Sequence, residues 1–248
     1  MLKCDLHMHS VEDPRDVLMH DASELVDHAA ALGYQVLALT LHGRLFCPPA
    51  LRDHAVSKGI LLIPGIEFYL EQREVLLLGN VEPYLKLLKT FDDLVALKKE
   101  RMEDILVIAP HPFYGRGKTV GDKLERYPDA FDAVEFCHFY TTWCNPNRRA
   151  QVVAERLGKP MIACSDAHRL CWMHDHYCRV DAAATQESVF SAVRAGRFKN
   201  VSRPLSAWRF FGEATWYCGI QDPLRHSRRL GLIRPWRPSR FDSTGRPP

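Results

Sequence analysis

The sequence lacks the features that define several common protein classes. None of its eight cysteines forms a C-x-x-C pair, which argues against a zinc ribbon and against a thioredoxin-type redox site. No apolar run approaches the ~20 residues of a membrane-spanning helix, and His7 and His9 stand where the apolar core of a signal peptide would lie. We therefore expect a cytoplasmic protein with reduced cysteines and no membrane partner.

The sequence also lacks a large excess of either positive or negative charge. The formal net charge is only +3, which argues against a nucleic-acid-binding polycation over the whole length. With 248 residues, 46% of them hydrophobic, the chain can form one large domain with a substantial core and has the size of an α/β barrel. Histidine, in contrast, is plentiful, with 12 residues. The positions of these histidines are informative.

Strand-like and helix-like segments alternate along most of the chain. Apolar residues at helical spacing, followed in most cases by a glycine, predict helices over 22–32, 49–58, 146–157 and 187–195, with one or two more within 85–99. Short apolar runs predict strands at 2–8, 35–41, 60–66, 74–79, 104–110, 131–136 and 160–165. Such alternation implies a parallel sheet with right-handed crossovers, either open or closed into a barrel.

Six of the seven predicted strands have His, Asp or Glu at or just beyond their carboxyl ends. These residues are His7, His9, His42, Glu67, His111, Glu135, His138, Asp166 and His168. In a parallel barrel the carboxyl ends form one rim, where active sites lie, whereas an open sheet would spread them. The pattern therefore favours a barrel, although any one of these residues taken alone is equally well explained as a turn, cap or surface residue.

The chemistry of this set indicates metal binding. His7 and His9 point to the same face of their strand because side chains alternate along a strand. Imidazole and carboxylate ligands without thiolate suit Zn, Mn or Fe. The ligands are too many for one tetrahedral site, so we expect two or three divalent ions, with Glu67 or Asp166 free to bridge them. Paired ions clamp a phosphoryl group during displacement and lower the pKa of a bridging water.

Five strand-end segments carry a family resemblance. They are Asp5-Leu6-His7-Met8-His9-Ser10, Thr40-Leu41-His42, Pro64-Gly65-Ile66-Glu67, Pro110-His111-Pro112 and Ser165-Asp166-Ala167-His168. In this order they resemble the motifs of the PHP (polymerase and histidinol phosphatase) superfamily of metal-dependent phosphoesterases, over about residues 3–200. The resemblance implies a distorted (β/α)7 barrel with a two- or three-metal cluster at its C-terminal rim. The ligands it implies are His7, His9, His42, Glu67, His111, Asp166 and His168, and we assign catalytic roles to Glu67, Asp166 and His168.

Two positions depart from the family pattern. Leu41 replaces the Asp that usually precedes the second-motif histidine, so we expect an orienting partner of His42 to be absent. The strand at 74–79 lacks the histidine that the family often places after it. A third metal would then need a ligand from elsewhere, for which His138 or Glu135 is available.

The family also has an Asp or His a few residues beyond its first motif. Asp13 fits this position best, with Asp16 and His20 as alternatives. Asp13 and His138 therefore complete the predicted set of metal ligands.

Basic residues follow several of the rim motifs and are suited to hold a substrate phosphate. They are Arg44, Arg116, Lys118 and Arg169. For at least some of them a solvated loop charge is the simpler interpretation.

Composition changes near residue 205, so we divide the chain into a barrel domain (1–204) and a C-terminal extension (205–248). From Arg225 onward the extension has seven arginines against one acid, Asp242, and it is rich in proline. This composition predicts a solvated, partly disordered tail, with contact to RNA or DNA as an alternative. Aromatic residues between 208 and 217 are expected to pack on the barrel.

These observations predict an enzyme that hydrolyses phosphate esters with a metal-bridging hydroxide. Its substrate would be a small phosphorylated molecule or a short nucleic acid, cut as a phosphomonoester or a phosphodiester, and no obligate protein partner is evident. Two alternatives stay open. One is an amidohydrolase-like C–N hydrolase, which also begins with His-x-His on a barrel strand. The other is a catalytically degenerate metal-binding scaffold, which Leu41 and the missing histidine favour.

Overall fold

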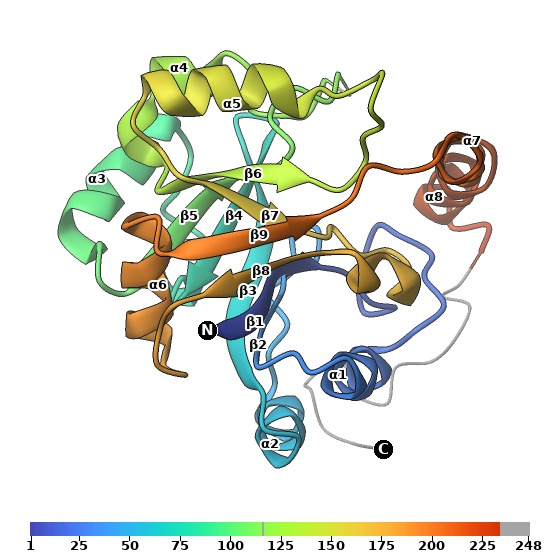
Figure 1. Ribbon diagram of the computed structural model, residues 1–248, viewed down its shortest axis with the longest axis horizontal. Coiled ribbons are helices and arrows are strands. Elements are labelled where there is room, and N and C mark those ends of the chain that lie inside the picture. Colours follow the sequence, from blue (N-terminus) through green and yellow to red (C-terminus); the bar gives the residue numbers. More distant parts are fainter. Residues whose placement is uncertain (116, 234–248) are drawn as a thin grey trace.

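The protein is built around one nine-stranded sheet (Figure 1). Its computed structural model describes residues 1–115 and 117–233. The strands lie in the order β7-β6-β5-β4-β3-β2-β1-β8-β9. Their bounds are β1 (Leu2–Met8), β2 (Val36–Leu39), β3 (Leu61–Leu70), β4 (Arg73–Gly79), β5 (Ile105–Ala109), β6 (Ala133–Cys137), β7 (Met161–Cys164), β8 (His176–Val180) and β9 (Phe198–Ser202). The first seven match the seven predicted strands to within a few residues.

The sheet is mixed rather than parallel throughout. Strands β1, β2 and β3 pair in parallel, as do β5, β6 and β7, but β4 is antiparallel to both β3 and β5. The expected parallel order is wrong at this point because only Glu71 and Gln72, both at positive φ, separate β3 from β4. A two-residue turn of this kind makes a hairpin and is too short for a crossover. The amino end of β4 therefore lies beside the carboxyl end of β3.

Two short strands whose sequences show no clear strand pattern extend the sheet beyond β1. Strand β8 is antiparallel to both β1 and β9. On the side of β7, a parallel bridge joins Met8 to Ala167, and the backbone N–H of His9 donates to the carbonyl of Ala167 at 3.1 Å. The two sides of the sheet thus approach each other, which gives the distorted, nearly closed barrel that the family resemblance implies.

Helices surround this sheet. Their bounds are α1 (Ala22–Ala31), α2 (Pro49–Ser57), α3 (Phe91–Arg101), α4 (Lys123–Arg126), α5 (Asn147–Arg156), α6 (Gln186–Arg194), α7 (Ala207–Thr215) and α8 (Asp222–Arg229), with short turns η1 (Glu82–Tyr84), η2 (Pro128–Ala130), η3 (Leu170–His174) and η4 (Trp216–Gln221). Helix α1 starts where its sequence predicts, because Asp21 and Glu24 form a capping box. No described helix is both long and apolar enough to cross a membrane.

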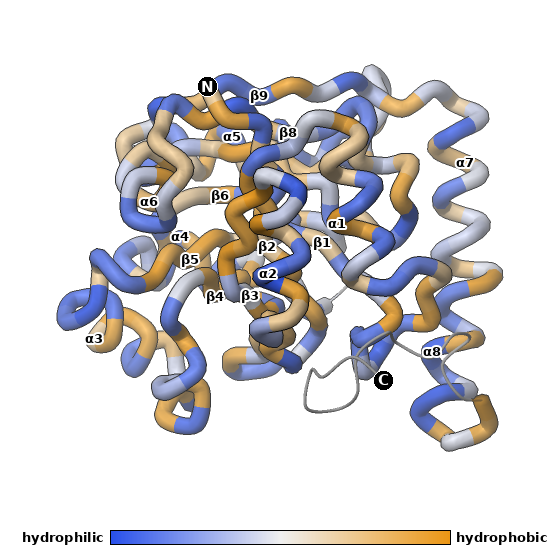
Figure 2. The backbone as a smooth tube through the Cα atoms, turned by 90° about the horizontal axis from the view of Figure 1, so that it is seen from below, coloured by the Kyte–Doolittle hydropathy of each residue, from blue (hydrophilic) through white to orange (hydrophobic). Residues whose placement is uncertain are grey.

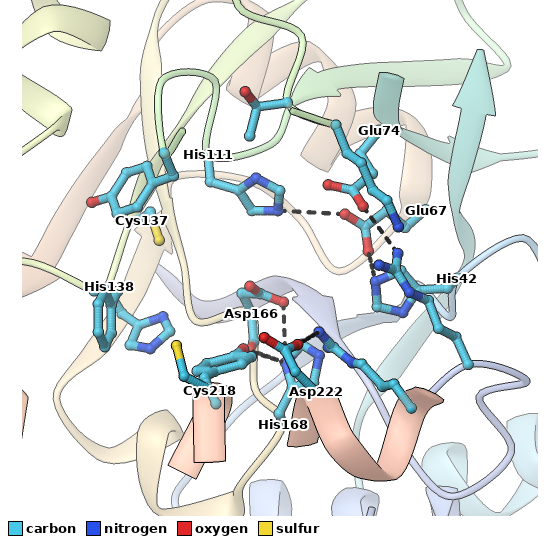
Figure 3. A pocket seen from close by; sticks show the side chains of 17 residues that line it. His42, Glu67, Glu74, His111, Cys137, His138, Asp166, His168, Cys218 and Asp222 are labelled. Carbon is cyan, nitrogen blue, oxygen red and sulfur yellow. Dashed lines mark hydrogen bonds and ion pairs between the residues drawn. The ribbon is translucent and has the colours of Figure 1, made fainter. Parts of the chain in front are cut away.

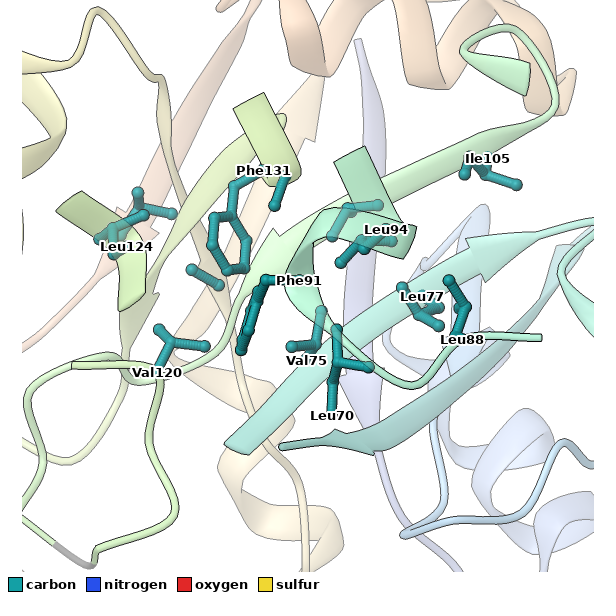
Figure 4. Close-up of a cluster of buried hydrophobic side chains, with 14 of the residues drawn as sticks. Leu70, Val75, Leu77, Leu88, Phe91, Leu94, Ile105, Val120, Leu124 and Phe131 are labelled. Carbon is teal, nitrogen blue, oxygen red and sulfur yellow. The ribbon is translucent and has the colours of Figure 1, made fainter. Parts of the chain in front are cut away.

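Apolar side chains fill both faces of the sheet. On the outside, Phe91 and Leu94 of α3 pack with Val75, Leu77 and Phe131 (Figure 4). A second outer cluster lies beneath α1 and α2, and a third joins strand residues to α6. Hydrophobic residues accordingly concentrate on the strands, while polar residues concentrate in the turns (Figure 2). This packing fixes the strands, and so the rim, in place.

The described part of the C-terminal extension is helical. Helices α7 and α8, joined through η4, stand at the side of the molecule that the carboxyl end of β6 faces (Figure 1). Tyr217 and Gln221 of η4 are buried. Of the aromatic residues expected to pack on the barrel, Tyr217 is buried, whereas Trp208 is exposed. Gln221 and Arg225 contact the segment after β1. Residues 234–248 of the predicted tail lie outside the described residues, and the boundary at 204 stays a prediction.

Candidate metal centre

The strand ends bring the predicted ligands together around Glu67 of β3 (Figure 3). Oε2 of Glu67 lies 3.0 Å from Nε2 of His42, 3.5 Å from Nε2 of His9 and 3.6 Å from Nε2 of His7. The other oxygen, Oε1, lies 3.4 Å from Nε2 of His111. One carboxylate thus faces four imidazoles that follow or end three different strands.

Asp166 and His168, which follow β7, close the cluster. Oδ1 of Asp166 lies 3.3 Å from Nε2 of His7 and 3.2 Å from Nε2 of His9. The ring of His168 stacks on that of His9, with centroids 4.3 Å apart. Both Asp166 and His111 adopt positive φ, at 47° and 27°, a strained backbone conformation that concentrates at functional sites. All seven ligands implied by the resemblance therefore meet at one rim.

Carboxylates behind the cluster hold its imidazoles. Nδ1 of His7 donates to Glu135 at 2.7 Å, and the Nδ1 atoms of His9 and His42 both donate to Oδ2 of Asp13 at 3.0 Å. Because an ionised carboxylate only accepts hydrogen bonds, each Nδ1 has a proton, so a ring that becomes neutral has its lone pair on Nε2, directed into the cluster. Asp13, a predicted ligand, thus lies behind two histidines and orients them.

Asp13 also replaces the orienting partner of His42 that Leu41 cannot supply. Leu41 is fully buried in the apolar cluster beneath α1 and α2. Asp13 accepts hydrogen bonds from both the ring and the backbone N–H of His42, the latter at 2.8 Å. The expectation that His42 lacks an orienting partner is therefore wrong, because the partner comes from the segment after β1 instead of from the neighbouring residue.

His168 has a similar arrangement, with partners that the sequence analysis does not assign. Its Nδ1 donates to the carbonyl of Asp166 at 2.8 Å, and its Nε2 lies 2.6 Å from Oδ2 of Asp16. Asp16 is fully buried, and Arg225 of α8 donates to both its oxygens, at 2.5 and 2.7 Å. The hydroxyl of Tyr217 lies 3.1 Å from Nδ1 of His168. Because Nε2 and the carboxylate are both acceptors, a cation between or beside them would satisfy both.

The charges of the cluster favour bound cations. Burial alone would lower the pKa of His9, but hydrogen bonds and charges from Asp13 and Asp166 outweigh it and raise this pKa to about 10. Burial likewise opposes the effect of Glu67, whose hydrogen bond raises the pKa of His111 to about 9. Once the protons on Nε2 of these rings are displaced, both buried oxygens of Glu67 are left without a hydrogen-bond donor from the described residues. A centre made of acceptors fits divalent ions, which displace such protons on binding.

The ligand atoms fall into overlapping groups, in each of which all atoms lie within 4.8 Å of one another. Four of the groups are His7, His9 and Asp166; His7, Glu67 and His111; His9, His42 and His168; and His42, Glu67 and Glu74. Shared members and separate groups suit a cluster of ions better than one tetrahedral site. Glu74 joins the set because β4 is antiparallel, so its amino end lies at the rim. For the same reason a histidine after Gly79 would lie at the opposite end of the barrel.

His138 lies in the same cavity but in none of these groups. Its ring packs on Trp172, with centroids 4.4 Å apart, and neither ring nitrogen has a hydrogen-bond partner among the described residues. Burial lowers the pKa of His138 to about 3, so its ring is neutral. The predicted role of His138 as a metal ligand stays a prediction.

The four predicted phosphate-binding residues do not all lie at the metal centre. Lys118 lines the cavity at the cluster, which has a volume of about 410 Å³. Arg44 instead donates to the carbonyl of Glu12 and lines a different groove, and Arg169 pairs with Glu213 of α7 at 3.3 Å. Arg116 lies outside the described residues. Arg15 and Arg225, for which the sequence gives no motif, line the cavity together with Lys118.

Comparison with known proteins agrees with this architecture. The PHP domain family matches residues 5–138, and the PHP-associated family matches residues 145–198. The chain belongs to the PHP family. No curated protein matches the sequence.

Several solved structures share the fold. A two-domain protein of Bacteroides vulgatus with a predicted PHP-like metal-dependent phosphoesterase has a TM-score of 0.62 and 18% identity, covering 85% of this chain and 68% of its own. PsfC of Pseudomonas syringae has a TM-score of 0.59 and 18% identity, with 94% and 99% covered. The lesion-specific endonuclease PfuEndoQ of Pyrococcus furiosus has a TM-score of 0.60 and 15% identity, with 96% and 73% covered.

Proposed function

We propose that this PHP-family protein is a metal-dependent hydrolase of phosphate esters. The observation that carries the proposal is the convergence of four imidazole Nε2 atoms, those of His7, His9, His42 and His111, on Glu67. The Nδ1 atoms of three of these rings are held from behind by Glu135 or Asp13. The ions would be two or three, of Zn, Mn or Fe, as the nitrogen and oxygen ligand set favours. The eight free cysteines suit a reduced, cytoplasmic setting.

The residues of the centre would have different roles. Glu67, Asp166 and the histidines would hold divalent ions, which supply charge neutralisation at a phosphoryl group and lower the pKa of water. Lys118, with Arg15 and Arg225 beside it in the cavity wall, would bind and orient phosphoryl oxygens. Burial of the cluster excludes bulk water and strengthens these charge interactions. Asp13 and Glu135 keep the imidazoles in the ligating tautomer.

The class of ester is a further part of the proposal. A cavity of about 410 Å³ beside cationic side chains suits a phosphomonoester, a nucleotide or the end of a short nucleic-acid strand. PfuEndoQ, which has the same fold, is an endonuclease, and this supports testing oligonucleotides beside small phosphate esters.

The experiment combines metal analysis with a substrate screen. Wild-type protein, His9→Ala and Asp166→Ala variants would be assayed on 4-nitrophenyl phosphate, nucleotides and short oligonucleotides, with bound metal measured on the same samples. We expect bound metal and hydrolysis in the wild type, with both reduced strongly in the variants. Unchanged hydrolysis in both variants would contradict the proposal. Metal binding without hydrolysis of any ester would instead support a non-catalytic scaffold.

A further inference from the structure

A second groove opens beside the cavity of the metal centre. It has a volume of about 800 Å³ and shares Arg15, Lys118, Asp222 and Arg225 with the cavity wall. Away from the metal ligands it continues along α8 to Arg229. Because the two spaces share these side chains, they adjoin each other. We call this space the α8 groove.

The α8 groove is lined by four cationic side chains and one carboxylate, Asp222. Two of the cations are neutralised: Arg15 pairs with Glu74 at 3.2 Å, and Arg225 pairs with Asp16. No acid of the described residues forms an ion pair with the other two, Lys118 and Arg229. The lining of the groove therefore has an excess of positive charge.

The electrostatics of Lys118 are consistent with this excess. Burial and the charge of Arg15 lower the pKa of Lys118, and Arg225 and Arg229 lower it further, while Glu74 acts in the opposite direction. Three guanidinium groups are thus near enough to disfavour the charge of this ammonium group. An anion bound among them would relieve the repulsion.

Both walls of the groove are anchored. On one side, Arg73 donates to the carbonyls of Gly117 and Thr119, at 2.8 and 3.2 Å, and the backbone N–H of Glu74 donates to the carbonyl of Lys118 at 2.7 Å. These bonds fix the backbone that presents Lys118.

On the other side, polar contacts tie α8 to the segment after β1. Gln221, just before α8, donates to the carbonyl of Val17 at 2.7 Å. Arg225 pairs with both oxygens of Asp16, and Arg228 donates to its backbone carbonyl. Cations held on fixed walls lose little freedom when an anion binds, which favours affinity.

We propose that the α8 groove binds a second phosphate of a substrate whose reacting phosphate lies at the metal centre. The inference rests on the proposed function and narrows its substrate class to phosphate esters that have at least one further phosphate. A bisphosphorylated small molecule and a short nucleic-acid strand share this chemistry. Lys118 lies where the two spaces meet, and Arg229 would contact the second phosphate alone, because it lines only the groove.

The direct test measures binding to the metal-free full-length protein, so that it does not depend on catalysis. A fluorescent, 5′-phosphorylated tetrathymidylate is titrated by anisotropy, and unlabelled fructose 1,6-bisphosphate and inorganic phosphate serve as competitors. The variant Lys118→Ala/Arg229→Ala removes the two unpaired cations. The control, Arg52→Ala/Lys199→Ala, removes two exposed cations elsewhere.

We expect the groove variant to weaken binding about tenfold or more, since two charge-assisted hydrogen bonds are lost, and the control to bind as the wild type does. Stronger displacement by fructose 1,6-bisphosphate than by phosphate would assign the groove to small bisphosphates, and binding of the oligonucleotide alone would assign it to nucleic acid. Equal binding of the oligonucleotide by wild type and groove variant, or no binding by either, would overturn the inference.

Kinetics separate this inference from the proposed function. In the groove variant, kcat/KM for substrates with two phosphates should fall about tenfold more than kcat/KM for 4-nitrophenyl phosphate. An equal fall for both would overturn the inference and leave the hydrolase standing. A wild-type protein that hydrolyses no ester would overturn the proposed function, and the binding experiment would still decide whether the groove takes a second phosphate.

Discussion

The two sides of the cavity are built in different ways. On the barrel side, Glu67 lies in a strand, and the other ligands end strands or follow them closely. On the extension side, Tyr217 and Arg225 reach the same cavity from helices that stand outside the sheet. The barrel side contributes mostly ligands, whereas the extension side contributes a hydroxyl, a thiol, a carboxylate and a guanidinium group.

The two sides differ because strand ends and packed helices are positioned by different interactions. Strand ends converge at one rim because hydrogen bonding fixes the sheet, so ligands can be placed there to within a fraction of an ångström. A helical segment packed against the rim is placed by side-chain contacts, here those of Gln221 and Arg225 with the segment after β1. We therefore expect the barrel side to decide whether metal is held, and the extension side to decide how well the site is ordered and which anions it accepts.

The largest effect is expected for Glu67→Gln on the barrel side. Glu67 faces four imidazoles, so its neutral amide would supply NH2 donors where the cluster needs acceptors and would remove the central negative charge. We expect kcat/KM for the best ester to fall about 10³-fold or more, with bound metal reduced in elemental analysis. An active Glu67→Gln variant with full metal would show that the barrel side does not decide metal binding.

The next effect is expected for Glu135→Gln, which keeps the shape of the side chain but weakens its hold on Nδ1 of His7. Loss of such a partner typically lowers metal affinity about 10- to 100-fold, which a competition titration with a chelating dye would measure. The matched control is Glu125→Gln on α4, an exchange at a partly exposed site away from the cluster. Equal metal affinity in both variants would show that Glu135 does not support metal binding through His7.

Arg225→Ala tests the extension side. It leaves the buried carboxylate of Asp16 without its guanidinium partner, so we expect a loss of about 3 kcal/mol in the free energy of unfolding, measured by urea denaturation. Activity should fall about tenfold, less than for the barrel variants. Arg209→Ala, which breaks an exposed pair with Asp175, should change both by little. A loss of all metal in Arg225→Ala would erase the distinction between the two sides.

The smallest effect on activity is expected at His176 of β8, which belongs to neither side. Burial lowers the pKa of His176 to about 4, below its value of ~6.5 in an unfolded chain. Its contribution to stability is therefore complete above pH 6.5 and is lost as the pH falls towards 4, by up to about 3 kcal/mol. Denaturation between pH 7 and 4 should show a shallower decline for His176→Gln than for wild type. A decline of equal slope would rule out His176 as its source.

Most of the barrel side of the cavity can be predicted from the sequence, whereas little of the extension side can. The hydrophobic pattern of the strands is enough to predict one rim for the residues at their ends, which include His7, His9, His42, Asp166 and His168. The antiparallel course of β4 is not visible in the apolar run that forms it, because direction depends on the two-residue turn before it. Consequently Glu74 could not be expected at the rim from strand order alone.

Contacts between segments far apart in the sequence are also not predicted by the hydrophobic pattern. Asp16 and Arg225 are far apart in the sequence, and the arginine lies in a segment whose composition alone predicts a solvated tail. Its order comes from burial against the barrel and from Asp16, which no local pattern reports. Asp13 was found by its position after the first motif, but its role behind His9 and His42 depends on their rotamers. Strands β8 and β9 are short and contain charged residues, so they give only a weak strand pattern.

The central claim is that the acceptor cluster around Glu67 holds divalent ions. The most direct measurement is the metal content of the full-length protein, purified without chelator and analysed for Zn, Mn and Fe per chain, beside the Glu67→Gln variant. We expect two to three equivalents in the wild type and a marked reduction in the variant. Less than one equivalent in a folded wild-type protein that also takes up no added Zn, Mn or Fe would contradict it.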